Sequence, residues 1–216
     1  LSGSMDFASS GRSKRQVMQE FVAVMAKLLM RRGNRTGAMF LTPTAPSGVQ
    51  HIPAKMGRRH LLHLLHVLQN APHASGPHET DLTHWLASAN GLLKRRANVF
   101  VISDFLGPTD WASEMASLGR RHDVVAVRVM DPVEMQLPNA GLMLLQDSET
   151  AEQLLLDTAD PKFRARYAQL VQERELTVQN TFAQSGVDGL ELSTDEDLAE
   201  ALIRFSELRK RRKWRA

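Results

Sequence analysis

The fold is decided by the stretch Val99-Phe100-Val101-Ile102-Ser103-Asp104-Phe105. Four consecutive apolar residues, three of them β-branched, predict a strand that is buried on both faces. Strands of this kind belong to parallel sheets with helices on both sides. A carboxylate just past such a strand lies at the carboxyl edge of the sheet, where open α/β folds bind ligands. Asp104 is therefore the first candidate for a binding residue.

Helical and strand patterns alternate on both sides of this stretch, which predicts an α/β fold with a doubly wound, mostly parallel sheet flanked by helices. A pair of apolar segments near 142–156 predicts a β-hairpin inserted into that pattern. The predicted helices begin after candidate N-cap residues, which are Ser13, Thr80, Thr109, Asp160 and Thr194. The remaining strands are predicted at 36–41, 49–52, 124–129 and 190–192.

The bulk composition is that of a globular chain. At 216 residues with 43% hydrophobic residues, it suits a single domain over 1–216 with one sizeable core. There is no apolar run near 18 residues and no visible signal peptide. The chain has no cysteine, which leaves no disulfide framework and no thiolate zinc site. These features favour a cytoplasmic protein.

The positive charge is concentrated at the C-terminal end. The chain has 27 Lys and Arg against 24 Asp and Glu, and six of the basic residues lie within 209–216. The rest is mildly acidic. This basic tail is interpreted as a solvated chain end. A contact with nucleic acid is the alternative, although one tryptophan, Trp214, provides no stacking platform for bases.

Two serines near the start of the chain complete a candidate site with Asp104. A doubly wound sheet needs a central strand ahead of the helix that begins near Lys14, and we expect that strand upstream of Leu1, beside the strand at 99–102. Its end would bring Ser2 and Ser4 near Asp104, and Thr80 opens a helix that precedes the same strand. Hydroxyl and carboxylate oxygens are the donors that Mg²⁺ prefers.

Several short motifs, in order along nearly the whole chain, resemble one protein family. Leu1-Ser2-Gly3-Ser4-Met5 resembles the tail of the Asp-x-Ser-x-Ser motif of von Willebrand factor A domains. Six further motifs follow in order along the chain: Ser4–Phe7 with Lys14, Gly33–Gly37, Ser103–Phe105, Arg121–Val124, Asp131–Glu134 and Asp147–Thr150. Together these resemble the domain-of-unknown-function-58 family, bacterial proteins often encoded beside MoxR-type AAA+ ATPases.

The resemblance implies a von Willebrand factor A-like fold and a metal-ion-dependent adhesion site. Ser2, Ser4 and Thr80 would be direct ligands of magnesium, and Asp104 would act through water. The first aspartate of the motif would precede Leu1 and is not in this sequence. The implied function is a non-enzymatic protein-binding module that holds an acidic residue of its partner through the metal. The implied partner is an AAA+ ATPase, in the assembly or maturation of another complex.

Asp131 and Glu134 follow the strand at 124–129 and are predicted to lie on the same edge as Asp104. They are candidates for a rim that contacts the partner, although a turn at Pro132 explains Asp131 as well. A metal-assisted hydrolase at this edge is the enzymatic alternative. It is disfavoured because no histidine is placed beside the site and no Gly-x-Ser-x-Gly elbow is present.

Overall fold

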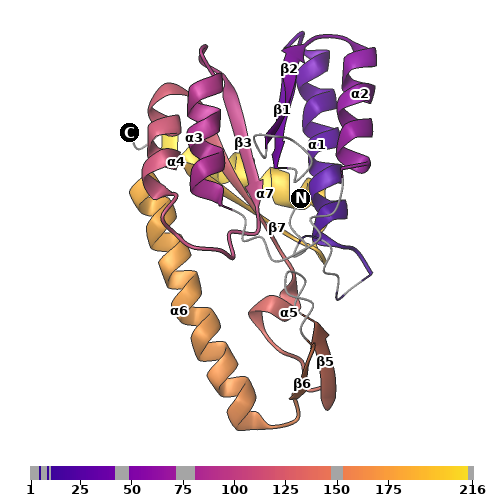
Figure 1. Ribbon diagram of the computed structural model, residues 1–216, viewed down its shortest axis with the longest axis vertical. Coiled ribbons are helices and arrows are strands. Elements are labelled where there is room, and N and C mark those ends of the chain that lie inside the picture. The colour runs from indigo at the N-terminus through magenta and orange to yellow at the C-terminus, as the bar shows by residue number, and fades with distance from the viewer. Residues whose placement is uncertain are drawn as a thin grey trace.

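The computed structural model describes residues 5, 9, 11–41, 49–71, 81–146 and 153–213. Within these ranges the chain is mixed α/β, around a three-stranded parallel sheet in the order β3-β4-β7 (Figure 1). The strands are β3 (Asn98–Ser103), β4 (Asp123–Met130) and β7 (Asp188–Ser193). Val101 of β3 pairs with Ala126 of β4, and Val127 pairs with Leu190 of β7. The α/β class and the parallel pairing of the strand at 99–102 are thus confirmed.

Two antiparallel pairs accompany this sheet. β1 (Thr36–Leu41) pairs with β2 (Val49–Lys55), and β5 (Leu142–Gln146) pairs with β6 (Gln153–Asp157). The second pair is the predicted hairpin. The first pair was expected to join the main sheet, but among the described strands β1 pairs only with β2. Figure 1 shows β1 and β2 beside α1 and α2, on the other side of the molecule from α3 and α4.

Seven helices surround these strands in the described ranges. They are α1 (Lys14–Arg31), α2 (Arg58–Gln69), α3 (Leu82–Leu92), α4 (Ala112–Arg121), α5 (Pro132–Met135), α6 (Pro161–Ser185) and α7 (Leu198–Lys213). α6 is the longest, and it extends away from the sheet toward the β5–β6 pair (Figure 1).

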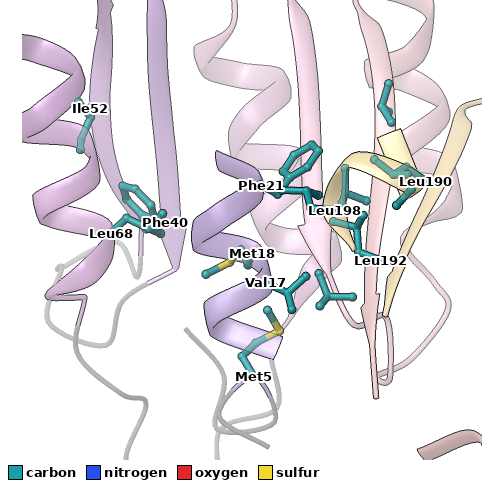
Figure 2. Packing of buried hydrophobic residues seen from close by; sticks show 14 residues of the cluster. Met5, Val17, Met18, Phe21, Phe40, Ile52, Leu68, Leu190, Leu192 and Leu198 are labelled. Carbon is teal, nitrogen blue, oxygen red and sulfur yellow. The ribbon is translucent and has the colours of Figure 1, made fainter. Parts of the chain in front are cut away.

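β4 is buried on both faces because its side chains alternate between two cores. Val125, Val127 and Val129 join a core built with α1, α7 and β7, part of which Figure 2 shows. Val124 and Ala126 face a second core, built with α3, α4 and α6. The uninterrupted apolar run of the sequence is therefore explained by helices on both sides of the sheet.

Some helices begin at the cap residues that the local sequence predicts, and others do not. Ser13 caps α1 in a capping box with Gln16, and Asp160 with Pro161 opens α6, both as predicted. The predicted caps Thr80, Thr109 and Thr194 are wrong. Asp81 caps α3 by accepting the N–H of His84. α4 begins only after Trp111, and Ala199 at the start of α7 donates its N–H to Asp197 instead.

The C-terminal basic segment is partly integrated into the fold. Residues 209–213 continue α7, and Arg209 forms ion pairs with Asp123 and Asp188. Arg209 thus anchors α7 to the amino-terminal ends of β4 and β7, and the interpretation of the whole segment as a solvated end is wrong for this residue. No helix in the described part of the chain is both long enough and apolar enough to cross a membrane.

Candidate functional site

Polar residues from four elements meet at the carboxyl edge of the parallel sheet. Asp104 follows β3, Asp131 follows β4, Thr194 follows β7, and Lys14 is the first residue of α1. Each of these four residues is buried. Because the strands are parallel, residues that are 63 to 90 positions apart in the sequence come into contact at this edge. We call these four residues, with Glu134 and Ser9, the edge cluster.

The ammonium group of Lys14 lies at the centre of the edge cluster. Its Nζ is 3.1 Å from Oδ2 of Asp104 and 2.6 Å from Oε1 of Glu134, and the lysine side chain is fully buried. A buried cation is stable only when opposite charges and hydrogen bonds replace its lost hydration. Lys14 therefore ties the start of α1 to the ends of β3 and β4.

Asp131 is the most completely bound carboxylate of the cluster. It accepts hydrogen bonds from the backbone N–H and hydroxyl of Ser9, the N–H of Val133 and the hydroxyl of Thr194. Burial by itself would raise the pKa of Asp131, but these hydrogen bonds outweigh it and lower that pKa below its ordinary value. The Asp131 side chain is thus an ionised link between three segments of the chain.

Glu134 closes the cluster on the side of α5. Its Oε2 accepts the N–H of Asp131 in a capping box, while Oε1 faces Lys14. Tyr167 of α6 donates its hydroxyl to the Glu134 carbonyl at 3.0 Å, and burial raises the pKa of that phenol. The predicted rim residues are therefore structural members of the cluster, with Asp131 fully enclosed and Glu134 partly exposed.

The backbone directly after Asp104 adopts a conformation that is rare for a bulky residue. Phe105 has φ of +54°, in the left-handed region. Its buried ring packs against Trp111 and Phe182, with centroid separations of 5.1 and 4.9 Å. This aromatic packing holds a turn that costs roughly 1–2 kcal/mol for a residue with a Cβ. Local strain held by surrounding structure is a frequent property of binding sites.

The oxygens of Asp104 are not equally engaged. Among the described residues, Oδ2 contacts Lys14, whereas Oδ1 accepts a long contact of 3.5 Å from the N–H of Leu106. With respect to the described residues, Oδ1 of Asp104 therefore has acceptor capacity that a metal-bound water could use. Ser2, Ser4 and Thr80 lie outside the described residues. Among the residues that are described, no group of three His, Asp or Glu is arranged to hold a metal ion.

Sequence reasoning placed Asp104, Asp131 and Glu134 at this edge but did not assign Lys14, Ser9 or Thr194 to the site. A signal for Lys14 was present. A cation in the first turn of a helix is disfavoured by the helix dipole, and α1 has no acidic residue in that turn. A lysine at such a position indicates an anionic neighbour elsewhere in the fold. No comparable signal distinguished Ser9 or Thr194 from other hydroxyl residues.

Sequence comparison finds one family and several relatives that are described as uncharacterised. The profile of the family described as "Protein of unknown function DUF58" matches residues 1–177. An uncharacterised protein of Mycobacterium tuberculosis is 30% identical over 211 residues, which cover 98% of this chain and 65% of that protein. A Paracoccus denitrificans protein named "Uncharacterized protein in moxR 3'region" is 33% identical over 106 residues, 48% of this chain and 99% of that protein.

Comparison with solved structures supports the fold. The crystal structure of the conserved hypothetical protein BatB from Bacteroides thetaiotaomicron superposes with a TM-score of 0.57 at 12% identity. The match covers 99% of this chain and 95% of BatB. At this identity the likeness concerns the fold alone.

The expectation of a cytoplasmic protein is corrected. The crystal structure of an uncharacterised membrane-spanning protein from Vibrio fischeri is a further match, but its TM-score of 0.32 at 15% identity is too low to support an argument about this chain. The expectation had rested on the lack of cysteine and of a long apolar run, and neither feature determines a location. The localisation of this protein is therefore not determined.

Proposed function

The chain belongs to the DUF58 family, and from this premise we propose that it is a protein-binding module whose docking surface is the carboxyl edge of the parallel sheet. The observation that carries the proposal is the edge cluster, in which the Lys14 ammonium contacts the carboxylates of Asp104 and Glu134 and the buried Asp131 belongs to the same cluster. Open α/β sheets bind ligands at this edge. We further propose that the fold is von Willebrand factor A-like.

The edge cluster holds the loops that a partner would contact. Lys14 fixes Asp104 and Glu134 relative to α1, and Asp131 fixes Ser9 and Thr194. The loop after Asp104 carries exposed residues, Gly107, Pro108 and Asp110. A rigid base beneath an exposed loop lowers the entropy lost on docking, because the loop is already ordered.

The charge of the cluster is consistent with a cation at this edge. The three carboxylates exceed the single ammonium, so the described side chains leave a negative excess. We propose that Ser2, Ser4 and Thr80 hold Mg²⁺ with Asp104 as the outer ligand. When bound, the metal would supply an electrophile for a carboxylate of the partner. Few protein ligands suffice because Mg²⁺ keeps much of its water.

The proposed partner is a MoxR-type AAA+ ATPase. The support is the relative from Paracoccus denitrificans, which is named by its position in the moxR 3' region. Because the chain spans only 65% of the length of the mycobacterial relatives, the activity and partners of the whole protein are part of this proposal.

The test is the affinity of the full-length protein for a purified MoxR-type ATPase of the same organism, measured with Mg²⁺ and with EDTA. Asp104→Asn should weaken binding at least tenfold, about 1.4 kcal/mol. Asp110→Arg should weaken it similarly without touching the buried cluster, which guards against a folding defect. Glu207→Arg, at an exposed position on α7, is the matched control.

Each result bears on a separate part of the proposal. Equal binding by Asp110→Arg, Asp104→Asn and the control would reject the carboxyl edge as the docking surface. Equal affinity with Mg²⁺ and with EDTA would reject the metal while leaving the edge in place. Lack of any affinity for the ATPase would reject the partner.

A further inference from the structure

A second concentration of positive charge, apart from the C-terminal segment, lies in residues 21–78. This stretch carries seven of the 27 Lys and Arg residues of the chain and none of its 24 Asp and Glu residues. Its described part contains the second half of α1, β1, β2 and α2. Because the whole chain has a formal charge of only +3, the residues outside this stretch are acidic on balance.

The fold brings the ends of these four elements together. Thr36 at the start of β1 pairs with Lys55 at the end of β2, and Nε2 of His60 in α2 hydrogen-bonds to the Thr36 carbonyl at 2.8 Å. The last residue of α1, Arg31, precedes Thr36 by one short turn. Six exposed basic residues therefore lie close to this junction along the chain: Arg31, Arg32, Arg35, Lys55, Arg58 and Arg59.

This junction lies at the amino end of the parallel sheet. α1 starts at the carboxyl edge, where Lys14 contacts Asp104, and it passes β3 at Phe100, whose ring meets Phe21 at 5.6 Å. Its 18 residues extend for about 27 Å toward the opposite end. Figure 1 shows the connection from β2 to α2 and the start of β3 at that same end. Just before β3 the chain has three more exposed basic residues, Lys94, Arg95 and Arg96. We call these nine residues the basic end.

The cations of the basic end are not neutralised by carboxylates in the part of the chain that the structure describes. The ion pairs there involve other cations, which are Arg12, Lys14, Arg128, Arg204 and Arg209. α2 also begins at Gly57 without a side-chain cap, and its first turn contains Arg58 and Arg59 but no acidic residue. Because positive side chains at a helix N-terminus are disfavoured by the helix dipole, an external anion would stabilise this arrangement.

Exposed apolar side chains lie among these cations. Four large ones, close in sequence to the basic residues, are roughly half exposed: Leu28 (48%), Met56 (55%), Leu62 (55%) and Leu92 (47%). A surface that combines Lys and Arg with exposed apolar side chains is typical of proteins that lie on anionic bilayers. The cations contact the lipid headgroups, and the apolar groups enter the boundary between headgroups and acyl chains.

The same surface is poorly suited to nucleic acid. Phe21, Phe40 and Trp85 are the only Phe, Tyr or Trp residues between positions 21 and 98. Phe21 and Phe40 are buried, and Trp85 is partly buried against the core on the side of α3 and α4. Single-stranded nucleic acid is held by exposed aromatic rings on which its bases stack. The leucines and the methionine would gain nothing from contacts with a phosphate backbone.

We propose that the basic end is a docking surface for a bilayer that contains anionic lipid. Its Lys and Arg side chains contact the phosphate headgroups, and Met56 and Leu28 enter the interface. Each basic residue near such a surface contributes roughly fivefold to the affinity. The edge cluster lies at the opposite end of α1. The bound protein would therefore present its carboxyl edge away from the membrane.

Vesicle binding by the full-length protein tests the proposal. The affinity for phosphatidylcholine vesicles with about 30% phosphatidylglycerol should exceed that for pure phosphatidylcholine at least about tenfold, and it should fall as NaCl rises from ~0.1 to ~0.5 M. The double variant Arg58→Glu with Arg59→Glu should bind the anionic vesicles at least about tenfold more weakly. Lys162→Glu with Arg166→Glu makes the same charge change at exposed positions on α6 and should bind within about threefold of the unchanged protein.

Three results would overturn the proposal. Equal affinity for the two lipid compositions would exclude a role for anionic headgroups. Equal weakening in the two double variants would assign the attraction to the net charge of the protein rather than to the basic end. Tighter binding of a duplex DNA or an RNA than of the anionic vesicles, at the same salt concentration, would assign the surface to nucleic acid.

The orientation on the bilayer gives an independent measurement. This chain contains no cysteine, so Met56→Cys and Asp110→Cys each introduce one labelling site into it, at opposite ends of the sheet. An environment-sensitive dye at position 56 should shift to shorter emission wavelength when anionic vesicles are added, and the same dye at position 110 should not. A shift at position 110 alone, or at neither position, would contradict the proposed surface. Both measurements omit the ATPase, so their failure would leave the proposed function untouched.

Discussion

The buried Nζ of Lys14 lies 3.1 Å from Oδ2 of Asp104, across 90 residues of sequence. This contact joins the first turn of α1 to the end of β3 at the edge where the chain is proposed to bind its partner. Since the lysine side chain has no exposure to water, its charge depends on Asp104 and Glu134 for stabilisation.

Replacing Lys14 with methionine should destabilise the fold strongly. The variant keeps much of the apolar volume but leaves Asp104 and Glu134 without their cation in a buried setting. Loss of one partner of a buried ion pair costs about 3–5 kcal/mol. Urea unfolding of both proteins measures the difference, and a loss below about 1 kcal/mol would show that water already screens these carboxylates.

Phe105 provides a test of backbone strain. Phe105→Ala removes the ring that packs on Trp111 and Phe182 but keeps a Cβ at a φ of +54°. Phe105→Gly removes the ring and relieves the strain. We expect both to be destabilised by about 3–5 kcal/mol, with the glycine variant about 1 kcal/mol more stable than the alanine variant. The opposite order in thermal or urea unfolding would contradict a strained turn.

Acid should lower the free energy of unfolding, because it protonates Asp131 in the edge cluster. Because hydrogen bonds lower the folded pKa of Asp131 below 3.8, the unfolded chain binds more protons between the two pKa values. The stabilisation is complete above about pH 5 and is lost as pH falls through the lowered pKa. Asp131→Asn should flatten this part of the stability profile between pH 5 and 3. An unchanged slope would assign the acid sensitivity to other carboxylates, such as Glu175 of α6, whose pKa is lowered by its hydrogen bonds from Arg128.

His122 should produce a separate pH effect near neutrality. Burial, aided by the charge of Arg121, lowers the pKa of His122, and neither ring nitrogen has a hydrogen-bond partner in the described structure. Its folded pKa therefore lies below the ordinary 6.5, so stability is full above that pH and declines as pH falls through the lowered value. His122→Phe should reduce the fall in Tm between pH 7.5 and 5. An identical fall in the variant would exclude His122 as the cause.

The sequence predicted a helix or strand correctly where one local interaction determined it. The apolar run at 99–102 forms a parallel strand as predicted, although only Val101 is fully buried and the other three residues are partly buried. Asp160 and Pro161 begin α6 as predicted, because an N-cap side chain and a fixed proline φ both act within one turn. Thr194 was assigned to a cap because its hydroxyl type suits one. In the fold that hydroxyl donates to Asp131 at 2.8 Å, while Asp197 accepts the N–H of Ala199 at the start of α7.

Long-range contacts explain most of the remaining differences between the predicted site and the site in the structure. Asp104, Asp131 and Glu134 were placed on one edge because each follows a predicted parallel strand. The partner of Asp104 was not predictable from its own segment, since Lys14 is 90 residues away. The proposed ligands Ser2, Ser4 and Thr80 lie outside the described residues, and their role stays a prediction.

Amide exchange in the complex with the MoxR-type ATPase tests the docking surface most directly. Binding at the carboxyl edge predicts slower exchange in the loops that follow β3 and β4, at residues 105–111 and 132–138, with little change along the outer face of α6. Protection confined to α6, α2 or the β5–β6 pair, with the two loops unaffected, would contradict the assignment of this edge as the binding surface.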